Sequence, residues 1–178
     1  AFLNQSTAEK IALNQEIELS RKILYIFDIT PKSENSIDIL RAFEDNIGTM
    51  PYGDSVMYVY YGEDGEILGY AVPISGPGLW GSIEGYIGIS NDYSKVLGID
   101  FVKHSETPGL GGRISEDEFK EQFRGLDLTN TTDGNYIIYR PAAGGNVDAI
   151  AGATLTSKSV SKIINEDLQR FFDERRPN

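Results

Sequence analysis

The sequence predicts one α+β domain, in which an antiparallel sheet of short strands is flanked by N-terminal and C-terminal helices. Its 178 residues correspond to about one domain of ordinary size. Apolar residues recur at helical spacing only near the two ends of the chain, whereas β-branched and aromatic runs separated by turn sequences fill the middle. Helices, then a strand meander, then helices is an element order typical of the α+β class.

The N-terminal part of the chain is expected to form two helices. A stripe of apolar residues with imperfect helical spacing runs from Ser6 to Phe27. A second stripe predicts a helix from Ser36 to Ile47, and Gly48 is placed to serve as its C-cap. We therefore expect a helical region at residues 1–50, which packs with residues 51–178 as one compact unit.

From residue 56 the pattern changes to short strands. Runs of β-branched and aromatic residues, bounded by Gly, Asn and Asp turns, predict strands at residues 56–61, 66–74, 83–89 and 95–103. An acidic segment predicts a helix over residues 115–123, and a short strand is expected at Tyr136–Tyr139. The last helix, which ends near Phe172, carries its apolar residues at steps of three and four.

Composition excludes several functions. Sixteen Lys and Arg against 27 Asp and Glu give a net charge of −11, which repels phosphate backbones and argues against nucleic acid as a partner. The absence of Cys removes a thiol nucleophile, iron–sulfur ligation and thioether haem. A single His, His104, leaves no multi-His metal site, so no metal site is expected. Redox chemistry would therefore need an organic cofactor.

Three glycine-rich segments are the candidates for a binding site: Ser75–Gly81, Glu106–Gly112 and Ala151–Thr156. Glycine at the end of a strand permits close approach of the backbone to a ligand, although tight hairpin turns explain it equally well. The first segment contains a formal G-x-G-x-x-G match, but a strand-like sequence follows it where a dinucleotide fingerprint needs a helix. Trp80 lies in this segment, where its indole either covers a flat ligand ring or caps the core.

The other two segments suggest a phosphate and a planar ligand. Gly152 and Ala153 leave the backbone uncrowded before a helix, whose N-terminus favours an anion, with hydroxyls and a cation supplied by Thr154, Thr156 and Lys158. The alternative is that one of the two threonines is only the N-cap. In HSETPGLGG, backbone amides could address the heteroatom edge of a planar ligand, and we interpret His104 as structural.

Together and in this order, these segments resemble the FMN-binding domain family. That family includes the C subunit of the sodium-translocating NADH:quinone oxidoreductase and the G subunit of the RNF electron-transport complex. The family's attachment motif is an Asp, a few small residues, Gly-Ala-Thr, one free position and then Ser or Thr. It matches Asp148 to Thr156, with Ala151 where Ser or Thr is more usual. ETPGLGG is the second signature, and Leu79-Trp80 favours the C subunit over the G subunit.

The resemblance implies that residues 51–178 form the FMN-binding domain and that FMN is attached by a phosphoester to Thr156. The expected contacts to the ring and ribityl chain are Leu79, Trp80, Glu106, Thr107, Gly109 and Leu110. Those expected near the phosphate are Gly152, Ala153, Thr154 and Lys158. This assignment requires that the Thr156 hydroxyl be accessible and that the three glycine-rich segments lie close together.

The resemblance further implies an electron-carrying subunit of a membrane-bound, ion-translocating NADH:quinone oxidoreductase, with no complete catalytic site in this chain alone. Its partners would be other subunits of that complex and a flavin transferase that makes the ester. The domain would lie on the extracytoplasmic (periplasmic) face, anchored by a helix upstream of this sequence, because no run of about 18 apolar residues is present. The alternatives are an RNF G subunit or another extracytoplasmic FMN-binding domain, and an extracytoplasmic binding module without a cofactor.

Overall fold

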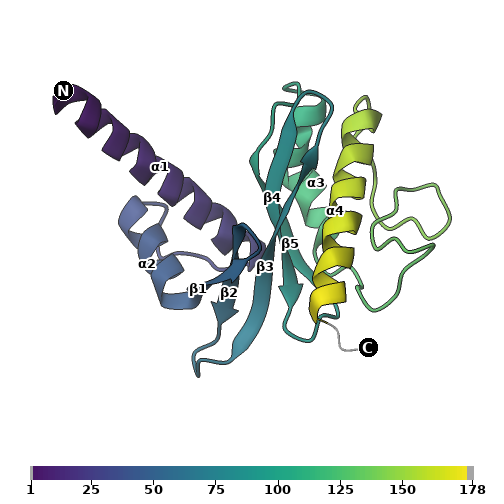
Figure 1. Cartoon of the computed structure of the whole chain (residues 1–178), viewed down its shortest axis with the longest axis horizontal. Coiled ribbons are helices and arrows are strands. Elements are labelled where there is room, and N and C mark those ends of the chain that lie inside the picture. Colours follow the sequence, from purple (N-terminus) through teal and green to yellow (C-terminus); the bar gives the residue numbers. More distant parts are fainter. Residues whose placement is uncertain (1, 176–178) are drawn as a thin grey trace.

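A five-stranded antiparallel sheet in the order β1-β2-β3-β4-β5 lies at the centre of the molecule (Figure 1). The computed structural model describes residues 2–175, with side chains from residue 7 onward. The strands are β1 (Ile47–Tyr52), β2 (Ser55–Tyr61), β3 (Ile67–Pro77), β4 (Ser82–Ser90) and β5 (Val96–Lys103). Each strand pairs with its neighbour in the sequence, which confirms the predicted meander and α+β class.

The sheet separates two hydrophobic cores. On one face, α4 (Thr154–Arg175) packs over strand residues that alternate along β3 and β4, such as Val72, Ile74 and Ile87. On the other face, α1 (Phe2–Ile26) and α2 (Ser36–Asn46) form a smaller core around Ile23 and Ile39. Two 3-10 helices, η1 (Gly111–Ser115) and η2 (Glu121–Phe123), and the short helix α3 (Asp117–Lys120) follow the edge strand β5.

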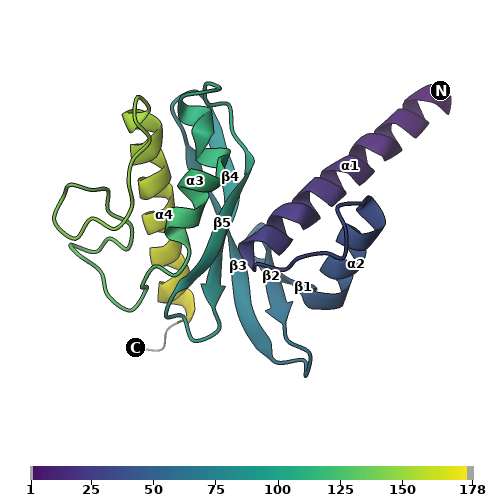
Figure 2. The same ribbon diagram turned by 180° about the vertical axis from the view of Figure 1, so that it is seen from behind.

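The first half of α1 projects away from the sheet, as both views show (Figures 1 and 2). Residues 7–16 are exposed along this half, and burial begins at Ile17. The helix joins the domain only through its C-terminal half. Among the described residues, no helix combines the length and the apolar character that a membrane crossing needs.

Three details of the predicted secondary structure are wrong. Gly48 is not a C-cap, because Ile47 is already extended and β1 begins there, so the boundary at residue 50 falls inside a strand. The predicted helix over residues 115–123 is divided into η1, α3 and η2. Residues 136–139 form only an isolated bridge, from Tyr139 to Val147, and the backbone of Tyr136 and Ile137 is bonded instead to the side chain of Asn165 on α4.

Candidate functional site

The three glycine-rich segments meet at one end of the molecule. The first forms the end of β3 and the turn into β4, the second follows β5 and leads into η1, and the third leads into α4. The β3–β4 turn and the N-terminal end of α4 lie at the top of Figure 1, on the same end of the sheet. The fold therefore satisfies the requirement that the segments lie close together.

Glu106 joins all three segments through one buried carboxylate. Its Oε1 accepts hydrogen bonds from the backbone N–H groups of Leu79, at 2.9 Å, and Trp80, at 3.1 Å. Its Oε2 accepts a hydrogen bond of 2.5 Å from the hydroxyl of Thr156. Only 4% of Glu106 and 1% of Thr156 is exposed to solvent. A buried carboxylate needs such donors, and here each of the other two segments supplies at least one.

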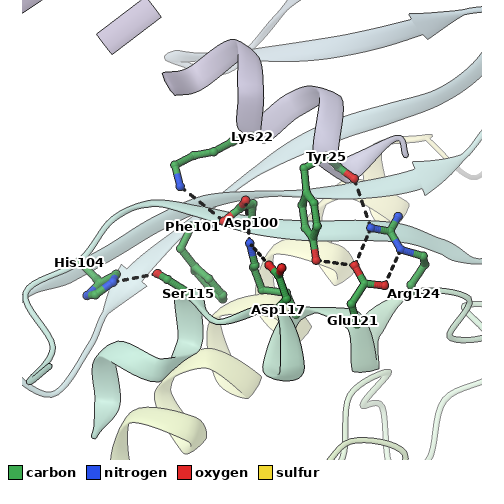
Figure 3. A network of polar contacts seen from close by, with 10 residues as sticks. Lys22, Tyr25, Asp100, Phe101, His104, Ser115, Asp117, Glu121 and Arg124 are labelled. Carbon is green, nitrogen blue, oxygen red and sulfur yellow. Dashed lines mark hydrogen bonds and ion pairs between the residues drawn. The ribbon is translucent and has the colours of Figure 1, made fainter. Parts of the chain in front are cut away.

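His104 holds the backbone that carries Glu106. The Glu106 N–H lies 3.3 Å from His104 Nδ1. On the other side of the ring, His104 Nε2 lies 3.0 Å from Ser115 Oγ (Figure 3). With Nδ1 as the acceptor, Nε2 carries the hydrogen that it donates to Ser115. The interpretation of His104 as a structural residue agrees with these contacts.

Two glycines are required by close packing at this carboxylate. A methyl group at Gly111 would stand 2.5 Å from Thr156 Oγ1 and 2.9 Å from Glu106 Oε2. A methyl group at Gly78 would stand 2.4 Å from Glu106 Oε1. These two glycines are therefore needed for more than turn formation, because the absence of a side chain lets two loops pack closely around the Glu106 carboxylate.

The start of α4 carries neither threonine as its N-cap. The first intrahelical hydrogen bond runs from Ser157 N to Ala153 O, at 3.0 Å, which puts Ala153 at the N-cap position. Thr154 is exposed in the first turn, and Thr156 points into the contact with Glu106. The interpretation of either threonine as a mere N-cap is therefore wrong. The N–H groups of this first turn have no partner within the helix and form a positive end.

Exposed apolar side chains surround this end of α4. Leu79, Leu110 and Leu155 are each about half exposed, and Trp80 is 69% exposed. A methyl group at Gly152 would lie 3.6 Å from Leu110 Cδ2, so the second segment touches the third. Large apolar side chains gathered on a surface are typical of a binding site. The sequence analysis missed Leu155, which occupies the free position of the attachment motif.

Thr107 and Gly109 belong to the same exposed loop. The carbonyl of Thr107 accepts hydrogen bonds from the N–H groups of Leu110 and Gly112, which closes the loop on itself. The Thr107 side chain and Gly109 are exposed. Both residues are therefore open to a ligand that lies on this loop.

Lys158 is exposed on α4, four residues after Thr154 and therefore on the same side of the helix. It also lines a cavity of about 290 Å³ between α4 and the segment around Asn135 and Tyr139. No residue of the three glycine-rich segments lines this cavity. The role of Lys158 as a phosphate contact stays a prediction.

Asp167 is a supporting residue that the sequence analysis missed. This buried α4 residue accepts a hydrogen bond of 2.8 Å from the N–H of Ser75, at the beginning of the first segment. Burial raises the pKa of its carboxyl, an effect opposed by the Ser75 N–H and by Arg170. No local pattern marks this residue, because its partner lies 92 positions away.

The second requirement, an accessible Thr156 hydroxyl, is not met in this conformation. Glu106 and Gly111 cover Thr156 Oγ1, and both belong to the second segment. Attachment at this oxygen therefore requires the second segment to move away from α4.

The fold and the loops define a small α+β domain in which a helix start with free N–H groups lies beside exposed apolar side chains. A family model for the FMN-binding domain matches residues 78–169, slightly more than half of the chain, and includes all three loops except the first residues of the first segment. The chain belongs to the FMN-binding domain family. Membership supports FMN as the cofactor, and the site fits it, because a phosphate suits the first turn of α4 and a planar ring suits the apolar surface.

Two kinds of relative are similar in sequence. The G subunit of the ion-translocating oxidoreductase complex of Methanosarcina acetivorans is 41% identical over 110 residues, which are 61% of this chain and 55% of that protein. The C subunit of the Na(+)-translocating NADH-quinone reductase of Pseudomonas aeruginosa is 33% identical over 137 residues, 72% of this chain and 52% of that protein. The chain spans about half the length, or less, of the curated relatives that it matches.

Solved structures share the fold. NqrC of Shewanella oneidensis superposes with a TM-score of 0.73 at 19% identity, over 90% of this chain and 97% of that one. The C subunit of the Na(+)-translocating NADH-quinone reductase of Parabacteroides distasonis gives 0.74 at 24% identity, over 94% and 96%. These likenesses confirm the α+β architecture.

Proposed function

We propose that this chain is an electron-carrying flavin domain in which FMN is joined through its phosphate to the hydroxyl of Thr156. The observation that carries this proposal is the single carboxylate, Glu106, that connects Thr156 with both other glycine-rich segments. The attachment motif and the second signature are far apart in the sequence, and this carboxylate joins them in one site.

The residues of the site divide between the two ends of the cofactor. The first turn of α4, which begins at Thr154, would hold the phosphate through its free N–H groups and the helix dipole. Gly152 and Ala153 lie directly before this turn and leave room for the phosphate, and the Ala153 N–H donates to Ile150 O. Leu79, Trp80 and Leu110 would hold the ring, and Thr107 and Gly109 leave backbone groups open to its polar edge.

The exposure of this surface agrees with an electron carrier. FMN, when bound, supplies reversible electron transfer, and the protein supplies orientation and local electrostatics. Trp80 and Leu79 stand at the surface, so a ring placed against them keeps one side open to a redox partner. No complete catalytic site is needed in the chain for this role.

The relatives are named as subunits of ion-translocating complexes, and this extends the proposal to a complex. We place the chain in an ion-translocating oxidoreductase, either as the C subunit of an NADH:quinone reductase or as a G subunit of the RNF type. Because the chain matches both kinds of subunit, the relatives do not decide between them. The Leu79-Trp80 pair favours the C subunit. Other subunits and a flavin transferase would be its partners. Its place would be the extracytoplasmic face of a membrane, anchored by a helix that precedes this sequence.

The mass of the intact protein, co-produced with a flavin transferase, tests the attachment. We expect a gain of one FMN minus one water in the wild type and in Thr154→Ala, and no gain in Thr156→Ala. Thr154 is a matched control because it is an exposed threonine in the same helical turn. Loss of the gain in Thr154→Ala alone would move the attachment to that residue. An unchanged mass and a colourless wild type would favour a binding module without a cofactor.

A further inference from the structure

We propose that the hydrogen bond from Thr156 Oγ1 holds the Glu106 carboxylate in place, and that Glu106 is a positioning residue for the first glycine-rich segment. When Thr156 carries an ester, this hydrogen bond is lost and Glu106 no longer holds that segment. The functional meaning of this inference rests on the proposed attachment at Thr156. Its structural step needs no flavin and is tested without one.

Three described groups donate hydrogen bonds to the Glu106 carboxylate. Within the described residues, Oε1 accepts from the two amides of Leu79 and Trp80, and Oε2 accepts from Thr156 alone. No lysine or arginine of the described residues forms an ion pair with this carboxylate. Gly111 packs against Oε2, so water has little space to replace the hydroxyl. A buried anionic oxygen without a donor is costly.

Ester formation removes that donor. The Thr156 Oγ1–H bond breaks, the proton leaves, and an Oγ1–P bond forms to an activated flavin nucleotide, whose own P–O bond to its leaving group breaks. The product is a phosphodiester with one negative charge, at the position that previously donated to Oε2. Two anions then face each other in a buried place, which is unfavourable for both.

The segment that carries Glu106 must respond, because α4 is fixed by the larger core. Residues 106–112 hold Gly111 and Leu110 as well as Glu106, so they would move together away from Thr156. The same displacement is needed for attachment to begin, and the ester then prevents the segment from returning, which leaves the amides of Leu79 and Trp80 free for other acceptors. The closed arrangement seen here is accordingly that of the unmodified domain.

The test compares three variants of the unmodified chain by residue-resolved amide hydrogen exchange. Thr156→Val removes the hydroxyl and keeps the shape, Thr156→Ser keeps a hydroxyl, and Thr154→Val is the exposed control. We expect the Leu79 and Trp80 amides to exchange at least about tenfold faster in Thr156→Val, as fits the loss of a hydrogen bond to a charged group. Exchange in the other two variants should stay within about twofold of the wild type.

A second substitution separates the charge on Glu106 from simple packing. Glu106→Gln, with Thr156 intact, keeps an Oε1 acceptor for the two amides and places an Nε2 donor where Thr156 Oγ1 can accept, so exchange should stay within about twofold of the wild type. Unchanged exchange in Thr156→Val, or fast exchange in Glu106→Gln, overturns the inference. The emission of Trp80, the only tryptophan, reports the same loop independently.

Modified and unmodified wild-type chains provide the remaining comparison. We expect faster exchange at Leu79 and Trp80 after attachment, and equal exchange would overturn the inference. The mass measurement on Thr156→Ala decides the proposed attachment separately. A failed attachment therefore leaves the unmodified variants interpretable, and a failed inference leaves the attachment intact.

Discussion

Arg124 is expected to be the main polar link between α1 and the rest of the domain. Its guanidinium donates to the backbone carbonyl of Tyr25 at 3.2 Å (Figure 3). It also donates to the carbonyls of Ile26, at 3.1 Å, and Leu97. Its Nε lies 3.0 Å from Glu121 Oε2, which fixes the orientation of the guanidinium plane. The last turn of α1 thus receives its missing donors from a residue 98 positions away in the sequence.

Arg124→Met keeps most of the aliphatic stem and removes every donor. Each hydrogen bond from a charged group contributes about 1.5–3 kcal/mol, which gives roughly 4.5–9 kcal/mol for the three carbonyls. Because carbonyls near the surface regain water when the side chain is removed, we expect a loss of about 3 kcal/mol of the free energy of unfolding. That loss is large for a domain of this size.

Urea denaturation followed by circular dichroism measures this loss. Arg41→Met is the matched control, because Arg41 is 65% exposed and forms only a 4.0 Å ion pair with Asp38. The control should lie within about 0.5 kcal/mol of the wild type. If Arg124→Met were no less stable than Arg41→Met, the contacts in Figure 3 would not hold α1 on the domain.

The remaining predictions concern acid stability, the α4 side chain that holds residues 136–137, and the ring surface. Arg124 and Tyr25 lower the pKa of Glu121 from 4.5 to about 2, so its contribution is complete above pH 4.5 and lost as the pH falls toward 2. In acid titrations of unfolding, Glu121→Gln should remove that part of the pH dependence, and an unchanged profile would contradict it. Asn165→Ala leaves two buried amides without an acceptor and should cost about 3 kcal/mol by urea denaturation, whereas the exposed control Gln169→Ala should cost less than about 0.5 kcal/mol. Trp80→Ala should change the fluorescence of attached flavin and leave the mass gain unchanged. Because Trp80 is exposed, the free energy of unfolding should change by less than about 0.5 kcal/mol. Unchanged flavin fluorescence would show that Trp80 does not contact the ring.

The order of the elements followed from the sequence because each strand pairs with its sequence neighbour. Local pattern is sufficient for a meander with short turns. It failed for β1, where Gly48 and Pro51 disfavour a strand although an edge position tolerates both. It failed also at residues 136–139, where the apolar and aromatic pattern is that of a strand. There a side chain of α4 bonds the backbone of Tyr136 and Ile137, and only Tyr139 pairs with another segment, at Val147.

The sequence indicated where the candidate site lies, but not which side chains connect its three segments. Glycine-rich segments at strand ends, and the run before α4, indicated where backbone would be open to a ligand. No sequence pattern indicated that Glu106 would bond Thr156 across 50 positions, or that this contact would bury the very hydroxyl proposed for attachment. Contacts of this kind depend on the packing of α4 against β3 and against η1, the helix that follows the Glu106 loop, which only the folded chain specifies.

Two carboxylates hold the first glycine-rich segment, and they differ in what they depend on. Asp167, from the buried face of α4, bonds the N–H of Ser75 and has no contact with Thr156. Glu106 bonds the amides of Leu79 and Trp80 and is itself held by Thr156. A change at the Thr156 hydroxyl therefore releases the tip of the segment but leaves its beginning on β3. In our proposal, attachment of FMN reshapes the apolar surface that receives the ring, while the sheet and α4 stay as they are.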